Sequence, residues 1–143
     1  MMAGIKGKDT RPEMLVRRAL FSHGYRYRLH CKDLAGTPDV VMRRWKVAIF
    51  VHGCFWHMHY GCRFAKLPAT RTEFWTNKLG ANIERDQRNI ASLQAQGWRV
   101  LVVWECATKG LMQQAALADA LSSWLESGAA TGELSDQTLL KNR

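Results

Sequence analysis

The spacing of hydrophobic residues along the chain predicts both helices and strands. Residues 11–22 have hydrophobic positions at helical spacing, which is typical of an amphipathic helix. Thr10 and Glu13 have the spacing of a capping box at its start, and Gly24 follows it as a stop signal. The expected apolar side of this helix consists of Met14, Leu15, Ala19 and Leu20.

Extended segments come next along the chain. The stretch "YRYRLH", residues 25–30, alternates in polarity and predicts a strand. The stretch "TPDVVMRRWKVAIFVHG", residues 37–53, predicts two strands joined at Arg43 and Arg44. Its run 47–51 is hydrophobic and rich in β-branched residues, which indicates a central, buried strand.

The second half of the chain predicts two further helices with a strand between them. A long helix is expected over residues 72–96, with Thr70 and Glu73 at capping-box spacing. The stretch "WRVLVVWE", residues 98–105, predicts a buried strand, and "LMQQAALADALSSWLES", residues 111–127, a final amphipathic helix. The long helix is expected to bury Leu79, Ile83, Ile90 and Leu93 and to expose Glu84, Arg85, Asp86, Gln87 and Arg88.

This order of elements predicts an α/β domain with a mixed central sheet flanked by helices on both faces. The 143 residues suit a single domain with one core. Residues 1–10 are expected to form a basic N-terminal arm, and residues 128–143 a loosely ordered tail.

Composition narrows the class of protein. Lys and Arg number 21 against 12 Asp and Glu, giving a net charge of +9 and a pI near 9.8, which suits a polyanionic partner such as nucleic acid. No apolar run approaches the roughly 20 residues of a membrane helix. The first residues, "MMAGIKGKDT", lack an apolar signal segment, so we expect a cytoplasmic protein.

Four residues of suitable type predict a metal centre. Cys54, His59 and Cys62 fall close together, and Cys106 follows the end of a buried strand. Three thiolates and one imidazole form a closed tetrahedral set that suits a structural zinc ion. Two alternatives remain open on the residues alone: His57 could replace His59, and Cys54 and Cys106 could be small buried hydrophobes. Cys31 is interpreted as a structural residue outside this set.

Other residues suggest hydrolytic chemistry. Asp39 lies at the start of one predicted strand and His52 at the end of the next, with His57 shortly after. A carboxylate with backbone carbonyls can hold Mg²⁺, and a histidine can take a proton from an attacking water. Glu13 could add a second acid if its helix packs nearby. The alternatives are a turn role for Asp39, a capping role for Glu13 and a structural role for His52.

Aromatic residues surround these histidines. Phe55 and Trp56 lie between the expected zinc ligands, and Trp75 lies in the first turn of the long helix. Apolar rings on a rigid base can be pushed between base steps of a duplex. The alternative is an ordinary core position, as expected for Trp104 and Trp124.

Several stretches together resemble the very short patch repair (Vsr-type) DNA mismatch endonucleases. They lie between Ile5 and Ala107 and include "KGKDTRPEMLVRRAL", "TPDVVM", "VAIFVHGCFWH", "LPATRTEFW", "ANIERD" and "GWRVLVVWEC". The resemblance implies a PD-(D/E)XK, restriction-endonuclease-like fold with an altered active site. It also implies a Mg²⁺-dependent enzyme that nicks one strand of double-stranded DNA 5′ to the thymine of a T:G mismatch, a lesion that arises from 5-methylcytosine deamination.

The same resemblance implies roles for individual residues. Asp39 and the backbone carbonyl of Val51 would bind Mg²⁺. The catalytic residues implied are Asp39, His52, His57 and Glu13; the structural zinc ligands Cys54, His59, Cys62 and Cys106; and the intercalating aromatics Phe55, Trp56 and Trp75. Lys6 and Lys8, in a short N-terminal arm, would contact the DNA backbone.

The resemblance also sets expectations about context. It implies a monomer associated with the nucleoid, with mismatch-repair proteins as further partners. A nuclease of the same fold with another DNA target is one alternative function. A non-catalytic zinc module that binds damaged DNA is another. A catalytic zinc would need an open coordination position, which four ligands would fill.

Overall fold

A five-stranded mixed sheet forms the centre of the protein. The structure is a computed structural model that describes residues 9–141. The strands lie in chain order across the sheet and are β1 (Arg28–Leu29), β2 (Val40–Met42), β3 (Val47–His52), β4 (Arg99–Trp104) and β5 (Thr131–Leu134). Strand β2 runs antiparallel to both β1 and β3, whereas β3, β4 and β5 are parallel. This mixed sheet confirms the predicted α/β class.

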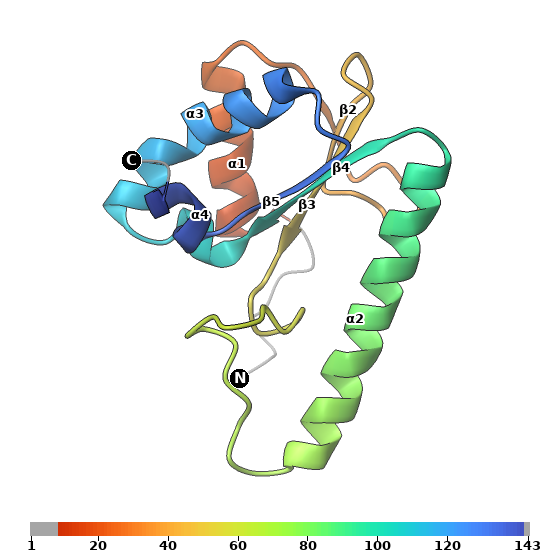
Figure 1. Ribbon diagram of the computed structural model, residues 1–143, viewed down its shortest axis with the longest axis vertical. Helices are drawn as coiled ribbons and strands as arrows, with labels where there is room; N and C mark the ends of the chain where they lie inside the picture. Colours follow the sequence, from red (N-terminus) through yellow and green to blue (C-terminus); the bar gives the residue numbers. More distant parts are fainter. Residues whose placement is uncertain (1–8, 142–143) are drawn as a thin grey trace.

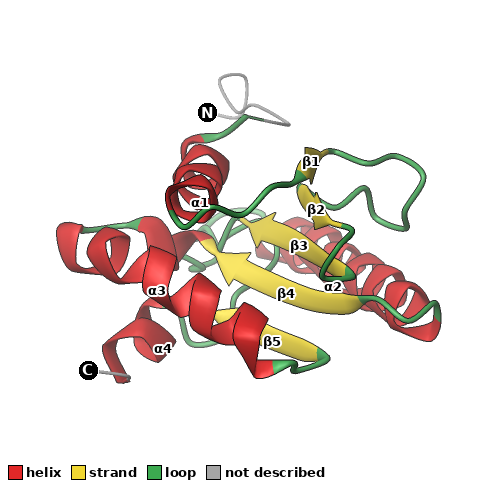
Figure 2. Cartoon of the chain, turned by 90° about the horizontal axis from the view of Figure 1, so that it is seen from above, coloured by secondary structure: helices red, strands yellow, loops and turns green. Residues whose placement is uncertain are grey.

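Helices cover both faces of this sheet (Figure 1). They are α1 (Arg11–Ser22), α2 (Thr72–Ala95), α3 (Leu111–Ser127) and α4 (Asp136–Lys141), with a 3-10 turn over Glu105–Thr108. Figure 2 shows α1 and α3 on one side of the strands and α2 on the other. None of the helices within residues 9–141 combines the length and hydropathy needed to cross a membrane.

Alternating residues of the strands divide the core into two layers. Val47 and Ile49 of β3 pack with residues of α1 and α3, whereas Ala48 and Phe50 pack on the opposite face with Leu93 of α2. Both sets are buried, so β3 is covered on both faces, as the hydrophobic run predicts. This burial fixes the register of β3 and therefore the position of the loop that follows it.

The expectation of a loosely ordered C-terminal tail is wrong. Residues 131–134 form β5, which pairs in parallel with β4, and α4 follows directly. The stretch "TGEL" is short and buries its last residue fully and Gly132 only in part, so it has no clear hydrophobic period. This segment is a strand because the edge of β4 offers it backbone hydrogen bonds, and no hydrophobic pattern in the sequence predicts that pairing.

Local signals at the element ends had mixed outcomes. Thr10 caps α1, and its hydroxyl oxygen accepts a hydrogen bond from the N–H of Glu13, as predicted. The capping box predicted at Thr70 is wrong, because α2 begins after Arg71, which has a left-handed backbone (φ 53°) and no side-chain cap. The predicted strand 25–30 is reduced to Arg28–Leu29, an exposed edge pair.

Candidate active site and metal centre

One loop, residues 53–62, brings the candidate residues together at the end of the parallel strands. His52, the last residue of β3, pairs with Trp104, the last residue of β4. The segments after both strands therefore leave the sheet at the same edge. Two backbone hydrogen bonds fold the loop back on itself, from the N–H of His57 to Gly53 (3.1 Å) and from the N–H of His59 to Cys54 (2.9 Å).

Cys54, His59, Cys62 and Cys106 meet in one cluster, with their ligand atoms all within 4.8 Å of one another. The Nδ1 atom of His59 lies 3.6 Å from the sulfurs of both Cys54 and Cys106. Zinc–sulfur bonds of about 2.3 Å and zinc–nitrogen bonds of about 2.0 Å at a tetrahedral angle separate S and N by about 3.5 Å. The donor set and its spacing therefore fit a four-coordinate zinc ion.

Without a bound cation, the electrostatics of this cluster favour the neutral thiol of Cys106. The adjacent Cys54 sulfur and burial raise the pKa of the Cys106 thiol well above its ordinary value. A bound cation reverses this effect, because coordinated thiols are deprotonated. The N–H of Asp136, at the start of α4, donates to the Cys106 sulfur (3.4 Å). The imidazole of His59 stacks on Trp104, with ring centres 4.1 Å apart.

A separate cleft of about 910 Å³ lies beside this cluster and is lined by Asp39, Glu13, Val51, His52 and His57, among others. Asp39 immediately precedes β2, and its Oδ2 accepts a hydrogen bond of 2.7 Å from the N–H of Val51. Burial raises the pKa of Asp39 from 3.8 to about 6, against the opposing effect of this hydrogen bond. A carboxylate in an open cleft fits Mg²⁺, which prefers oxygen ligands and keeps several waters.

The two histidines of the cleft stack face to face. The rings of His52 and His57 are 3.8 Å apart and parallel to within 1°. Burial, with a smaller effect of the neighbouring His57, lowers the pKa of His52 from 6.5 to about 3. His52 is therefore neutral at physiological pH, and its ring stacks against that of His57.

Asp86 of α2 is a site residue that the sequence analysis missed. Its Oδ2 lies 2.5 Å from Nδ1 of His57. The sequence pattern predicts Asp86 on the solvent side of the helix, but Ile83, Asp86 and Ile90 are all partly buried and line one further pocket, between α2 and the parallel strands. Positions separated by three and four residues share a helix face. The hydrophobic pattern therefore contained the signal, since Asp86 falls between two predicted core positions.

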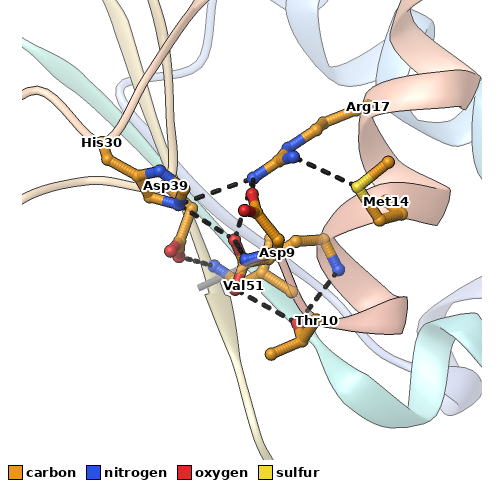
Figure 3. A network of polar contacts seen from close by, with 8 residues as sticks. Asp9, Thr10, Met14, Arg17, His30, Asp39 and Val51 are labelled. Carbon is orange, nitrogen blue, oxygen red and sulfur yellow. Dashed lines mark hydrogen bonds and ion pairs between the residues drawn. The ribbon is translucent and has the colours of Figure 1, made fainter. Parts of the chain in front are cut away.

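Glu13 lies in a network of polar contacts at the start of α1. Figure 3 shows this network and labels Asp9, Thr10, Met14, Arg17, His30, Asp39 and Val51. Glu13 is buried, and its carboxylate oxygens accept hydrogen bonds from Thr10 (3.1 Å), Arg17 (3.1 Å) and His30 (3.1 Å). The sequence analysis missed Arg17 and His30. Arg17 follows Glu13 at i,i+4 spacing, a signal that could have found it. His30 joins the network only because α1 packs on the face of the sheet to which β2 contributes Val40 and Met42.

The three aromatic candidates lie together at the surface end of the loop. Ring centres are 5.1 Å apart for Phe55 and Trp56, and 5.4 Å apart for Phe55 and Trp75. All three rings are partly exposed, unlike Trp104, which is buried as expected. Trp124, also expected to be buried, is only partly so. The backbone carbonyl of Trp56 accepts a hydrogen bond from Asn82 of α2 (2.9 Å), which fixes this group to the long helix.

The candidate residues thus separate into three groups around one loop. His59, rather than His57, lies beside the cysteine sulfurs, while His57 faces Asp86. Cys31 lies outside the cysteine cluster and packs against the core layer that contains Phe50 and Leu93. The expected DNA contacts Lys6 and Lys8 lie outside the described residues.

Comparisons with known proteins relate this chain to nicking enzymes. Residues 1–63 match the family described as DNA mismatch endonuclease Vsr. The Type II nicking enzyme V.XorIIP of Xanthomonas oryzae pv. oryzae is 53% identical over 111 residues, which cover 78% of this chain and 81% of that protein. The DNA mismatch endonuclease Vsr of Escherichia coli (strain K12) is 43% identical over 138 residues, covering 95% of this chain and 88% of that protein.

Proposed function

The chain belongs to the Vsr family of DNA mismatch endonucleases, and from this we propose that it nicks one strand of duplex DNA 5′ to the thymine of a T:G mismatch. The observation that supports this most is the arrangement of the cleft. A buried carboxylate, Asp39, and a carboxylate-paired histidine, His57, line the same cleft, with Phe55 and Trp56 beside them. The net charge of +9 suits a DNA substrate.

Asp39 and the carbonyl of Val51 would hold Mg²⁺, and Glu13 would assist from α1. A bound Mg²⁺ stabilises the charge that develops on the phosphate and its leaving oxygen during an in-line displacement. The hydrogen bond from Val51 to Asp39 (2.7 Å) keeps the carboxylate in one orientation. The cleft leaves room for a hydrated ion and a phosphate, as hydrolysis of a phosphodiester needs.

His57 is the general base of this proposal. Its Nδ1 is paired with Asp86, which leaves Nε2 to take a proton from the attacking water. The carboxylate of Asp86 stabilises the imidazolium that results and holds the ring in one tautomer. The neutral ring of His52, stacked beneath, limits its rotation without adding a positive charge.

The aromatic group of Phe55, Trp56 and Trp75 would enter the duplex beside the mismatch. Inserting rings between base steps costs a few kcal/mol of stacking, and less where the base pair is weak. Because α2 would hold the rings in place, the duplex would have to unstack to admit them. This cost would favour insertion at a mismatch over insertion at a fully paired step. Lys6 and Lys8 would add contacts to backbone phosphates.

Cys54, His59, Cys62 and Cys106 would hold a structural zinc ion. With four protein ligands the ion has no vacant position for a substrate. Its role would be to fix loop 53–62, so that the histidines and the aromatic rings keep their places on either side of it.

The test is a strand-specific nicking assay. A labelled duplex with one T:G pair is compared with its T:A and C:G controls, with Mg²⁺ and with no added metal. Mg²⁺-dependent nicking 5′ to the mismatched thymine alone is the expected result. Equal nicking of all three duplexes would contradict the mismatch preference and leave a nuclease of other specificity. Binding without nicking would favour a non-catalytic DNA-binding module.

The aromatic role has its own test in the double variant Phe55→Ala, Trp56→Ala. We expect its preference for T:G over T:A duplex to fall, while any residual nicking keeps its dependence on Mg²⁺. Phe21→Ala, which removes an exposed ring of α1 outside the lining of the cleft, is the matched control. A double variant with the full T:G preference would show that the rings have no part in discrimination.

A further inference from the structure

We propose that His30 and Arg17 are positioning residues that hold the Glu13 carboxylate as a fixed hydrogen-bond acceptor beside Asp39. This rests on the proposed function, because it assigns Glu13 to the water shell of the cation that Asp39 would bind. Neither His30 nor Arg17 reaches the reacting phosphate in this proposal. Both act through Glu13.

Several hydrogen-bond donors contact the carboxylate of Glu13. Its Oε1 accepts from the backbone N–H of Asp9 (3.2 Å), from Arg17 Nη2 (3.1 Å) and from His30 Nε2 (3.1 Å), and its Oε2 accepts from the Thr10 hydroxyl (3.1 Å). One oxygen is thus crowded with donors, while the other keeps capacity for a further donor such as a metal-bound water. A carboxylate surrounded by donors acts as an acceptor and not as a proton donor.

Two groups compete for the Nε2 nitrogen of His30. Nε2 lies 3.1 Å from the Glu13 oxygen and 3.5 Å from Arg17 Nη2. Arginine only donates and a carboxylate only accepts, so one ring nitrogen cannot satisfy both partners. The shorter contact to Glu13 therefore has the proton on Nε2. Arg17 is a neighbour of the ring, and its Nη2 is directed to the carboxylates of Glu13 (3.1 Å) and Asp9 (2.9 Å).

Arg17 is unusually placed for a purely structural residue. Its side chain is 8% exposed and that of Glu13 is 5% exposed, so the ion pair between them is buried. Within the described residues, the Nε of Arg17 is a buried nitrogen without a hydrogen-bond partner. Burying an arginine with one donor unpaired is unfavourable, and a hydrophobic residue would suit this helix face better for stability alone. The cost is consistent with a functional role.

His30 connects the carboxylate of Glu13 with the backbone of Asp39. Its ring contacts Glu13, while its backbone N–H donates to the carbonyl of Asp39 (3.3 Å). His30 has a left-handed backbone (φ 47°), a conformation that non-glycine residues seldom adopt. This turn at the end of β1 directs the ring toward α1. His30, Glu13 and Asp39 all line the same cleft.

The consequence concerns the affinity for metal. Outer partners that orient a metal site typically change metal affinity or activity by roughly 10- to 100-fold when removed. Loss of the His30 ring would let Glu13 move and weaken cation binding. It would not disturb the aromatic group, so binding of mismatched DNA without metal would remain.

The experiment compares His30→Ala, His30→Gln and the wild-type protein. Mn²⁺ binding is measured by calorimetry on the whole protein without DNA, and binding of a T:G duplex is measured without added metal. We expect His30→Ala to weaken Mn²⁺ binding by about 10-fold or more and to leave duplex binding unchanged. His30→Gln should recover most of the affinity, because its amide N–H can donate to Glu13. His23→Ala, at the other end of α1, is the matched control and should have no effect.

Equal Mn²⁺ affinity in His30→Ala and the wild type would overturn this inference, as would an equal loss in His30→Ala and His30→Gln. If His30→Ala does not fold, His30→Gln is compared with His30→Met, which has similar bulk and no donor. Failure of the proposed function is separable, because it would appear as a wild-type protein that binds Mn²⁺ but does not nick T:G duplex.

Discussion

The cysteine cluster and the cleft both use residues of loop 53–62, but their side chains are held in different ways. In the cluster, the side chains of Cys54, His59, Cys62 and Cys106 contact one another directly, with Nδ1 of His59 3.6 Å from two sulfurs. In the cleft, the candidate groups are held by individual contacts, as Asp39 is by the N–H of Val51 and His57 by Asp86 and the ring of His52. The four ligands of the first arrangement would fill the coordination sphere of a zinc ion, whereas the second arrangement opens on a cleft of about 910 Å³.

A short segment can therefore combine rigidity with access. A metal ion bound by the four ligands would fix the loop from one side, so that the residues on its other side would need no core of their own. Side chains at a binding site must be held by second contacts while their reactive atoms stay free. The division predicts that changes to the cluster act on folding and that changes to the cleft act on chemistry.

The largest expected effect is that of Cys106→Ser. Structural zinc sites contribute roughly 10–16 kcal/mol of apparent binding free energy, which is comparable with the roughly 5–15 kcal/mol of a whole domain. We expect the variant to lose zinc and to be unfolded or strongly destabilised at 25 °C. Thermal unfolding and zinc content by elemental analysis are the measurements. Cys31→Ser, a partly buried cysteine outside the cluster, is the control and should lose about 1 kcal/mol or less. A folded, zinc-free and active Cys106→Ser protein would remove the distinction between the two regions.

Asp39→Asn should have the next largest effect, on chemistry alone. The amide oxygen can still accept the Val51 hydrogen bond, while the charge that would bind Mg²⁺ is removed. We expect nicking to fall by at least about 10³-fold, the upper range for one preorganised electrostatic group. Binding of a T:G duplex and the melting temperature should stay close to wild type. Asp33→Asn, an exposed aspartate paired with Arg43, is the control. Nicking retained in Asp39→Asn would exclude Asp39 as a metal ligand.

Asp86→Asn tests the role of the carboxylate that is paired with His57. The His57 ring would lose its carboxylate partner but keep its stacking on His52. A loss of roughly 10- to 100-fold in kcat is expected, the range for outer groups that orient a functional histidine, with no change in KM for the duplex. Glu84→Gln makes the same change of charge at an exposed position of α2 and should be neutral. If the two variants behave alike, Asp86 has no role in orienting His57.

The pH dependence of stability gives the smallest effect. The pKa of His52 is about 3 in the folded protein and 6.5 in the unfolded chain, so the unfolded chain binds an extra proton between these values and stability falls as the pH falls through this window. Asp39 has the opposite sign, because its folded pKa of about 6 exceeds the unfolded 3.8 and acid adds stability there. The shifts correspond to roughly 5 and 3 kcal/mol, which leaves a net acid destabilisation of roughly 2 kcal/mol once the pH has passed through both windows.

Urea unfolding between pH 7 and 4 without added magnesium covers the upper part of both windows and measures the two opposing slopes. Asp39→Asn removes the stabilising term, so its stability should fall more steeply with acid than that of the wild type. His52→Gln should show a shallower fall. Parallel curves for all three proteins would mean that neither group titrates differently in the folded state.

Much of the fold could be predicted because its signals are local. The hydrophobic run 47–51 and the stretch "WRVLVVWE" predict buried strands, and both are central strands of the sheet. Burial on both faces makes such runs continuous, so they need no partner to be recognised. By contrast, β5 depends on pairing with β4, and the start of α2 depends on the left-handed turn at Arg71. These features arise from contacts and turns that no hydrophobic period marks.

The candidate site divides in the same way. The residue types of the cysteine cluster are visible in the sequence, because thiols and imidazoles gathered in one short loop are typical of a metal centre. The choice between His57 and His59 is a matter of side-chain direction along that loop. The structure shows His59 beside two sulfurs and His57 beside Asp86.

The α/β class, the basic charge, the cysteine and histidine ligand types and the motifs that resemble one enzyme family all follow from the sequence without coordinates. Hydrophobic period and residue chemistry are properties of short stretches, so they can be recognised before the chain is folded. Tertiary packing alone joined Asp86 to His57 and His30 to Glu13, across 29 and 17 residues of chain. The partners of a site residue come from whichever elements the core packs beside it, and that packing is a property of the whole chain.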